Sequence, residues 1–204
     1  MSDTDHDRRR PGVARPHRGG LALSAASSRE EFAAALARLG HTTLSQLDEE
    51  RAYEAFCEVA GAKAEVTVRD LEALVDDRLR AIADQYQLLR LETRTRTGEP
   101  AWARVELLER GIEIAIDAEG TGDGPIDAAL QAVVSALHIE AALLAFSVEA
   151  LSTGTDALCE AHVTVAVAGV SHQAEGVAAS LTEAGVRAFL AALSHARRAE
   201  RHGP

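Results

Sequence analysis

Apolar residues recur at helical spacing in three runs near the start of the chain, which predicts helices over residues 28–40, 45–61 and 67–82. The first run follows Ser27 and Ser28, either of which suits an N-cap, and it ends at a glycine. Three helices of this length make a bundle of about 55 residues, which is close to the lower limit for independent stability. We therefore expect the bundle to pack against a larger unit.

From Tyr86 the pattern changes to a period of two residues, which is typical of strands with one solvent-exposed face. Ile112, Ile114 and Ile116 alternate with more polar positions in the clearest of these runs. The predicted elements are strands over 86–97, 101–108 and 112–117, a glycine-rich turn over 120–124 and a helix over 125–137.

The same order of elements then returns, so the chain contains an internal repeat of three strands and a helix. One half has too little core to be stable alone, and we expect the two halves to pack as one domain with pseudo-two-fold symmetry. The fold class is therefore α+β. The second set of predicted elements comprises strands over 140–152, 157–168 and 170–176 and a helix over 180–195.

These patterns divide the chain into four parts. Residues 1–24 are rich in Arg, Asp, Pro and Gly and are predicted to be a disordered, solvated tail. Contact of its basic residues Arg8 to Arg10 with an acidic partner is the less favoured alternative. A helical subdomain follows over 25–84, then the duplicated βββα domain over 85–197 and a short tail over 198–204.

The stretch from Gly120 to Leu137 joins the first three strands to their helix. Its glycines permit backbone conformations that a side chain would disfavour, and Pro125 suits the first turn of a helix. Free N–H groups at such a helix start favour binding of a carboxylate. The alternative interpretation is a purely structural turn between a strand and a helix.

The net charge of −11 argues against nucleic acid or an anionic membrane surface as the main partner. The two cysteines, Cys57 and Cys159, lie far apart in the sequence and belong to no metal-binding motif. Since no signal peptide and no apolar run long enough to span a bilayer are visible, we expect a cytoplasmic protein.

Candidate catalytic chemistry is sparse. The histidines are scattered without the spacing of metal ligands, and no Ser/His/Asp or Cys/His arrangement is evident. We therefore expect no metal and no cofactor.

Three motifs resemble the C-terminal regulatory domain of the 2-isopropylmalate synthase and citramalate synthase family: GDGPIDAA at 122–129, GTDAL at 154–158 and EGVAAS at 175–180. The segment 32–74 is similar to the helical linker subdomain of that family. The resemblance covers residues 24–196. It implies an allosteric, leucine-sensing domain that forms dimers.

The catalytic barrel of that family, roughly 250 residues in an ordinary barrel fold, has no counterpart in this sequence. We therefore expect the chain not to condense acetyl-CoA with a keto acid by itself. The resemblance implies a homodimer that binds leucine or a related branched-chain acid. A separate synthase subunit that carries the barrel is a candidate partner.

The resemblance also implies a ligand pocket. It is formed by the start of the helix over 125–137, the strand over 140–152 and the turn that follows this strand. Its matching positions are Gly122, Gly124, Ile126, Asp127, Leu143, Phe146, Ala150, Asp156, Ala157 and Val177. Gly185 lies inside the last helix, where a close backbone contact would explain a glycine.

Two other interpretations stay open. The pocket could have acquired new chemistry, with Asp127, Glu149, Asp156 and His162 as candidate groups. Alternatively, the domain is an oligomerisation module without a ligand, in which Phe146 and Leu143 fill the pocket.

Overall fold

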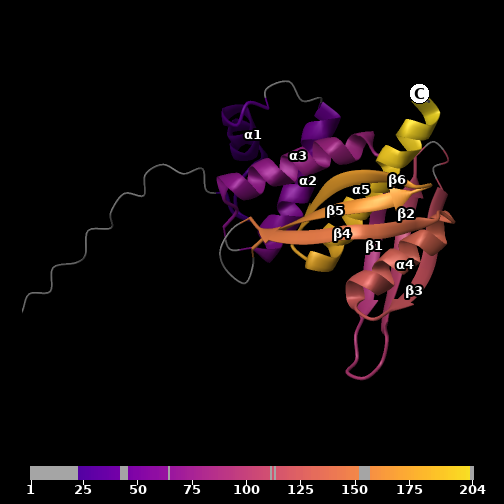
Figure 1. The fold of residues 1–204 in the computed structure, drawn as a ribbon. Helices are drawn as coiled ribbons and strands as arrows, with labels where there is room; N and C mark the ends of the chain where they lie inside the picture. Colours follow the sequence, from indigo (N-terminus) through magenta and orange to yellow (C-terminus); the bar gives the residue numbers. More distant parts are fainter. Residues whose placement is uncertain are drawn as a thin grey trace, which may run out of the picture.

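The computed structural model describes residues 23–41, 46–63, 65–110, 112, 114–151 and 157–202, and Figure 1 shows their arrangement. The predicted α+β class is confirmed, because three helices precede two repeats of three strands and a helix. Within the described residues the elements are α1 (Arg29–Arg38), α2 (Gln46–Ala62), α3 (Val68–Ala83), β1 (Tyr86–Arg94), β2 (Ala101–Glu109), β3 (Ile114–Gly122), α4 (Pro125–Leu137), β4 (Ala141–Ala150), β5 (Cys159–Val167), β6 (Val170–Ala178) and α5 (Leu181–His202). Residues 1–22 of the predicted tail lie outside the described residues.

A capping box fixes the beginning of α1. The Ser28 hydroxyl accepts a hydrogen bond from the Glu31 N–H at 3.2 Å, and the Glu31 carboxylate accepts one from the Ser28 N–H at 2.8 Å. The ring centroids of Phe32 and Phe56 lie 5.1 Å apart in the core that α1 shares with the next two helices. Further buried members of this core are Leu36, Val66, Leu71, Leu74 and Val75.

Each repeat forms an antiparallel three-stranded sheet, in the order β1-β2-β3 or β4-β5-β6. Both sheets carry the same irregularity, because Leu89 in β1 and Leu144 in β4 have no partner across the ladder. Helix α4 packs on β2 and β3, and α5 packs on β5 and β6 and also against β1. The two repeats share one hydrophobic core, as predicted.

Strand β3 extends to Gly122, whereas the sequence pattern placed the end of this strand at residue 117. The prediction of a turn over 120–124 is therefore wrong for Gly120 and Gly122. A Cβ atom added at Gly120 would lie 2.5 Å from the Ala128 carbonyl oxygen, and one added at Gly176 would lie 2.6 Å from that of Ala184. These glycines thus allow the helix backbone to pack directly on the strand.

Helix α5 continues to His202, beyond the predicted end at residue 195. The sequence after residue 195 consists mainly of Ala, Arg and Glu, which are good helix formers, and no glycine or proline precedes Gly203. The extension contacts the first repeat, because Arg197 donates a hydrogen bond to the Tyr86 hydroxyl at 3.1 Å.

The helical subdomain packs on the second repeat, at the ends of its strands (Figure 1). Leu151, Leu158 and Val177 belong to the hydrophobic core of the helices. The Val177 N–H also donates a hydrogen bond to the buried carboxylate of Asp77 on α3, at 3.1 Å. The expectation that the bundle packs against a larger unit is confirmed.

Among the helices of the described ranges, none combines the length and the hydropathy that crossing a membrane requires.

Candidate functional site at the start of α4

The first turn of α4 presents backbone donors. Gly124 is the N-cap residue, with φ −152° and ψ 172°, and it forms no side-chain cap hydrogen bond. The N–H groups of the first helical turn have no partner within a helix, and Pro125 at the first position lacks one altogether. The Asp127 carboxylate accepts a hydrogen bond from the Asp123 N–H at 3.0 Å, which closes the turn.

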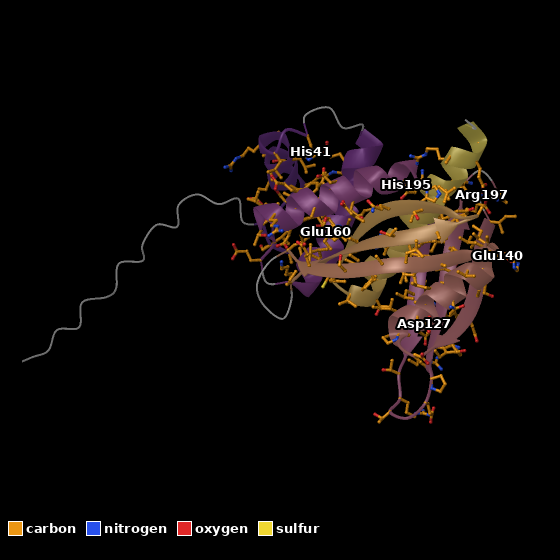
Figure 2. The ribbon with its side chains drawn as sticks, viewed as in Figure 1. His41, Asp127, Glu140, Glu160, His195 and Arg197 are labelled. Atoms are coloured by element: carbon orange, nitrogen blue, oxygen red, sulfur yellow. The ribbon has the colours of Figure 1, made fainter. Side chains whose placement is uncertain are left out.

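The tightness of this turn depends on Gly122. A Cβ atom added there would lie 2.6 Å from the Ala128 N–H nitrogen and 2.7 Å from the Asp127 carboxyl carbon. The structure therefore brings Gly122, Gly124, Ile126 and Asp127 together, as the sequence predicts for neighbours in the chain. Figure 2 shows Asp127 on the side of the molecule away from the helical subdomain.

Leu143, Phe146 and Ala150 share one face of β4. They pair with Val165, Val163 and Cys159 of β5, whose side chains point toward the core or its margin. The Leu143 side chain is nevertheless 39% exposed, since α5 lies mainly over β5 and β6.

The Phe146 ring lies over Gly185 of α5, where an added Cβ atom would approach the ring Cε2 to 3.0 Å. The glycine within α5 therefore makes room for an aromatic side chain. This corrects the expectation of a close backbone contact at Gly185.

The remaining predicted residues lie apart from these two groups. Val177 pairs with Glu160 on the opposite face of the second sheet and is buried under the helical subdomain. Ala157 is half-buried before β5, and Asp156 lies outside the described residues. Among the described side chains, no hydrogen bond joins the α4 residues to those of β4.

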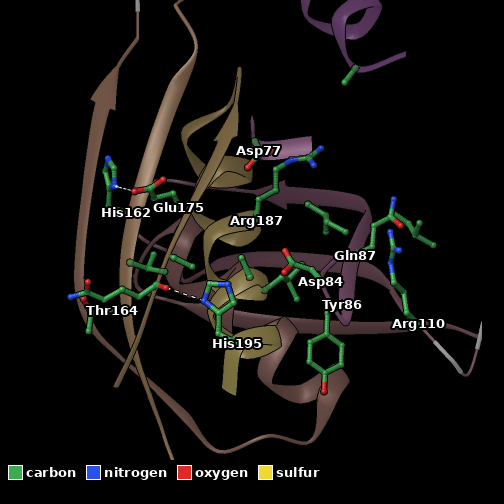
Figure 3. A pocket seen from close by; sticks show the side chains of 18 of the residues that line it. Asp77, Asp84, Tyr86, Gln87, Arg110, His162, Thr164, Glu175, Arg187 and His195 are labelled. Atoms are coloured by element: carbon green, nitrogen blue, oxygen red, sulfur yellow. Dashed lines mark hydrogen bonds and ion pairs between the residues drawn. The ribbon is translucent and has the colours of Figure 1, made fainter. Parts of the chain in front are cut away.

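A cavity of about 710 Å³ lies elsewhere, between the edge strands β1 and β6 (Figure 3). Residues 86–89 of β1, Ala145 and Ser147 of β4, residues 162–164 of β5 and residues 173–175 of β6 line it, together with one face of α5 and side chains from α2 and α3. None of the predicted ligand-binding residues that the structure describes lines this cavity.

Several ionisable groups surround the cavity. His162 lies 3.5 Å from the Glu175 carboxylate and 3.7 Å from that of Glu160, and the His195 ring lies 3.1 Å from the Gln173 carbonyl oxygen (Figure 3). Burial raises the pKa of Tyr86, although the hydrogen bond from Arg197 partly opposes this.

The groups suggested for a new catalytic role are not all together. His162 lines the cavity, but Asp127 and Glu149 do not. Within the described ranges, no three His, Cys, Asp or Glu side chains gather as metal ligands would.

Comparison with protein families gives a match over residues 65–196 to the LeuA allosteric (dimerisation) domain. This range covers α3, both repeats and most of α5. The chain therefore belongs to the LeuA allosteric (dimerisation) domain family.

Individual relatives extend the similarity of this LeuA domain into α1 and α2. The 2-isopropylmalate synthase of Acidimicrobium ferrooxidans is 35% identical over 179 residues, which are 87% of this chain and 34% of the relative. The 2-isopropylmalate synthase of Aquifex aeolicus is 36% identical, over 86% of this chain and 34% of the relative. That of Thiobacillus denitrificans is 34% identical, over 89% of this chain and 36% of the relative. The LeuA domain thus spans about a third of the length of the curated relatives that it matches.

The sequence pattern did not identify the polar residues around the cavity of the LeuA domain, among them Asp77, Glu175 and His195. They come from α3, β6 and α5, and each lies in a run that also suits a solvated face. No spacing in the sequence connects them, because only the tertiary fold brings them together.

Proposed function

We propose that this LeuA domain binds a small carboxylate, namely leucine or a related branched-chain amino acid, at the start of α4. The uncapped first turn of that helix carries the proposal, because its N–H groups suit a carboxylate and the helix dipole adds to the attraction. Asp127 keeps one oxygen for the Asp123 N–H and offers the other to the ligand ammonium group.

The proposed aliphatic side of the pocket consists of Ile126 together with Leu143, Phe146 and Ala150 of β4. These side chains are apolar, and the β4 face that bears the last three is incompletely covered. Gly122 permits the tight turn and Gly124 leaves the backbone accessible. Asp156 and Ala157 are proposed as outer members of the site, whereas Val177 lies apart from it, under the helical subdomain. A branched aliphatic side chain fits such an apolar wall, whereas a second charged group does not.

We further propose that the chain acts as a homodimer that regulates a synthase carrying the catalytic barrel. The family description names dimerisation and allostery, and the similar proteins are 2-isopropylmalate synthases about three times as long as the matched region. Two matched repeats with an incompletely covered strand support association of two copies.

Titration calorimetry with leucine, isoleucine and valine tests the ligand proposal. We expect heat with at least one of the three and a loss of about tenfold in affinity for Asp127→Asn, since an amide accepts an ammonium group less strongly. Glu183→Gln is the matched control because Glu183 occupies the first turn of α5, the corresponding helix of the second repeat. Its affinity should equal that of the unmodified chain.

Absence of heat and of any thermal shift with all three amino acids would contradict the ligand proposal. Equal losses of ligand affinity for Asp127→Asn and Glu183→Gln would contradict the placement of the ligand site at the start of α4. Regulation is tested separately, by measuring leucine inhibition of a barrel-bearing 2-isopropylmalate synthase with and without the chain. Unchanged inhibition would contradict the regulatory role alone.

A further inference from the structure

The stretch from residue 8 to residue 18 is the most basic part of the chain and has no part in the proposed ligand site. Although the whole chain carries a net charge of −11, this stretch contains no carboxylate. Opposite charges attract, so the acidic surfaces of the same chain are its nearest candidate partners. The five arginines of the stretch are Arg8, Arg9, Arg10, Arg15 and Arg18.

The cavity between β1 and β6 is acidic in its described lining (Figure 3). Its volume of about 710 Å³ lies within the range of ordinary ligand cavities, about 300–1,000 Å³. Arg110 and Arg187 line it, and Arg187 donates two hydrogen bonds to the Glu183 carboxylate, at 2.7 and 2.9 Å. Carboxylates outnumber these arginines, and they are Glu54 and Glu58 of α2, Asp77 of α3, Asp84 just beyond its end and Glu175 of β6.

The carboxylates of this cavity have local partners and still have capacity for a cation. Asp77 accepts the Val177 N–H at 3.1 Å, and the Glu175 carboxylate lies 3.5 Å from His162. A carboxylate offers about four lone-pair sites, so one such contact does not exclude a guanidinium group. The two glutamates of α2 that line the cavity are exposed, and they therefore meet an approaching cation first.

The described part of the chain begins beside the helix that carries Asp77. Leu23 forms an antiparallel bridge with Val66, with N–H···O distances of 2.8 and 3.2 Å, just before α3 begins. Asp77 lies about 14 Å from the first residue of α3 along the helix axis, at about 1.5 Å per residue. An extended chain of about 3.3 Å per residue covers about 26 Å from Leu23 to Arg15 and about 50 Å to Arg8. These arginines can therefore reach the cavity, and so short a tether gives them a millimolar effective concentration there.

We propose that residues 8–18 dock in this acidic cavity of their own chain. Their guanidinium groups bind its carboxylates, and their aliphatic stems lie on its apolar side, to which Leu88 and Leu190 belong. Pro11 and Pro16 restrict the backbone of the stretch, which lowers the entropy lost on docking. The carboxylates come from both the helical subdomain and the second repeat, so the docked stretch joins these two parts. The docking is independent of the ligand site proposed at α4, because none of the described residues of that site lines the cavity.

Trypsin cleavage of the bond between Arg8 and Arg9 in the full chain tests the docking, with a free peptide of residues 1–22 as the undocked reference. At about 20 mM salt we expect cleavage in the chain to be about tenfold slower than in the peptide, because several ion pairs together withhold the docked arginines from the protease. At about 500 mM salt, screening should bring the two rates within about twofold of each other. Equal rates at low salt would overturn the proposal, and this comparison needs no variant.

Paired charge reversals test the placement in the cavity. Glu54→Lys combined with Glu58→Lys should restore the cleavage rate of the peptide at low salt, because both carboxylates line the cavity. Glu72→Lys combined with Glu99→Lys is the matched control, since both side chains are exposed, neither lines the cavity and the net charge changes equally. The control should keep the slow cleavage of the unmodified chain. Equal acceleration by both pairs, or no acceleration by the first pair, would overturn the placement, and circular dichroism verifies that each variant is folded.

Discussion

Lys63 and Asp70 form a buried ion pair at the beginning of α3, with side-chain exposures of 4% and 0%. The Thr67 N–H and hydroxyl donate to the same carboxylate, at 2.9 and 2.7 Å. Burial by itself would raise the pKa of Asp70, but the hydrogen bonds from Lys63 and Thr67 outweigh it and hold the pKa below its usual value. The pair thus stabilises the folded chain only while Asp70 is ionised.

The depressed pKa gives stability a defined pH dependence. The contribution of the ionised Asp70 carboxylate to stability is fully present above the pKa of this group in the unfolded chain, about 4 for an aspartate. It is lost as pH falls through the lower pKa of the group in the folded chain. At pH 7 we expect Asp70→Asn to lower the unfolding free energy by about 3–5 kcal/mol, because the buried Lys63 side chain loses the carboxylate with which it forms an ion pair. Urea unfolding at several pH values measures the difference.

The difference between the unmodified chain and Asp70→Asn should shrink as pH is lowered from 5 to about 2. Glu72→Gln, an exposed carboxylate on the same helix, is the control and should show a small effect at pH 7. If the difference in unfolding free energy between the unmodified chain and Asp70→Asn stays constant with pH, the assigned role of the carboxylate is contradicted.

Among the helices and strands, the crossing of each repeat helix over the third strand of its sheet is the most constrained contact. Gly120 and Gly176 occupy equivalent positions, and each would bring an added Cβ atom within 2.6 Å of a helix carbonyl oxygen. Helix and strand backbones are in contact there. Even the single methyl group of an alanine would therefore clash, and no change of rotamer would relieve that clash.

Alanine substitutions separate this packing effect from backbone preference. We expect Gly120→Ala and Gly176→Ala each to destabilise by about 1–3 kcal/mol through overpacking. Gly61→Ala should instead stabilise by about 1 kcal/mol, because Gly61 lies in α2 with nothing within 4 Å of an added Cβ atom. Denaturant unfolding measures all three, and a stabilising Gly120→Ala would contradict the proposed close contact.

The elements were predictable because their signals are local. The alternation around Ile114 and the apolar spacing in α4 identify a strand and a helix from single runs of sequence. The continuation of β3 through Gly120 and Gly122 was not predictable, since glycine commonly signals a turn. Only the packing of α4 on β3 shows why this strand contains glycines. The end of α5 depends on Arg197 reaching Tyr86, which is also a tertiary contact.

At the scale of the whole molecule, one buried hydrogen bond joins the helical subdomain to the sheet edge. Asp77 lies beside Asp76 in the sequence, but it is buried and accepts the Val177 N–H, whereas Asp76 is exposed and faces His41 at 3.8 Å. Sequence pattern alone does not distinguish these neighbours. The same limit applies to the cavity and to the candidate ligand site, whose members lie on separate elements.

The two neighbouring aspartates provide a matched pair of variants. Asp77→Ala should lower stability by about 1–3 kcal/mol, because it leaves the buried Val177 N–H without its acceptor. Asp76→Ala should change stability by less than about 0.5 kcal/mol. Hydrogen exchange at Val177 should accelerate in the first variant and not in the second, while amides of α4 stay protected in both.

Equal exchange rates at Val177 in both variants would show that Asp77 does not secure the sheet edge. The measurement is specific to this contact, because a general loss of stability would also accelerate exchange in α4.

The packing of the helical subdomain on the second repeat has a consequence for communication within the chain. The start of α4 belongs to the first repeat, and that repeat meets the second through the contact of α4 with α5 and of α5 with β1. Within the described chain, a change at the α4 start can reach the three N-terminal helices through α5, or through β1, which α4 also contacts and which directly follows α3. Close contacts between small residues, such as that of Gly176 with Ala184, leave no space for one element to move independently of its neighbour. Even a slight shift of one element would therefore be transmitted to the next.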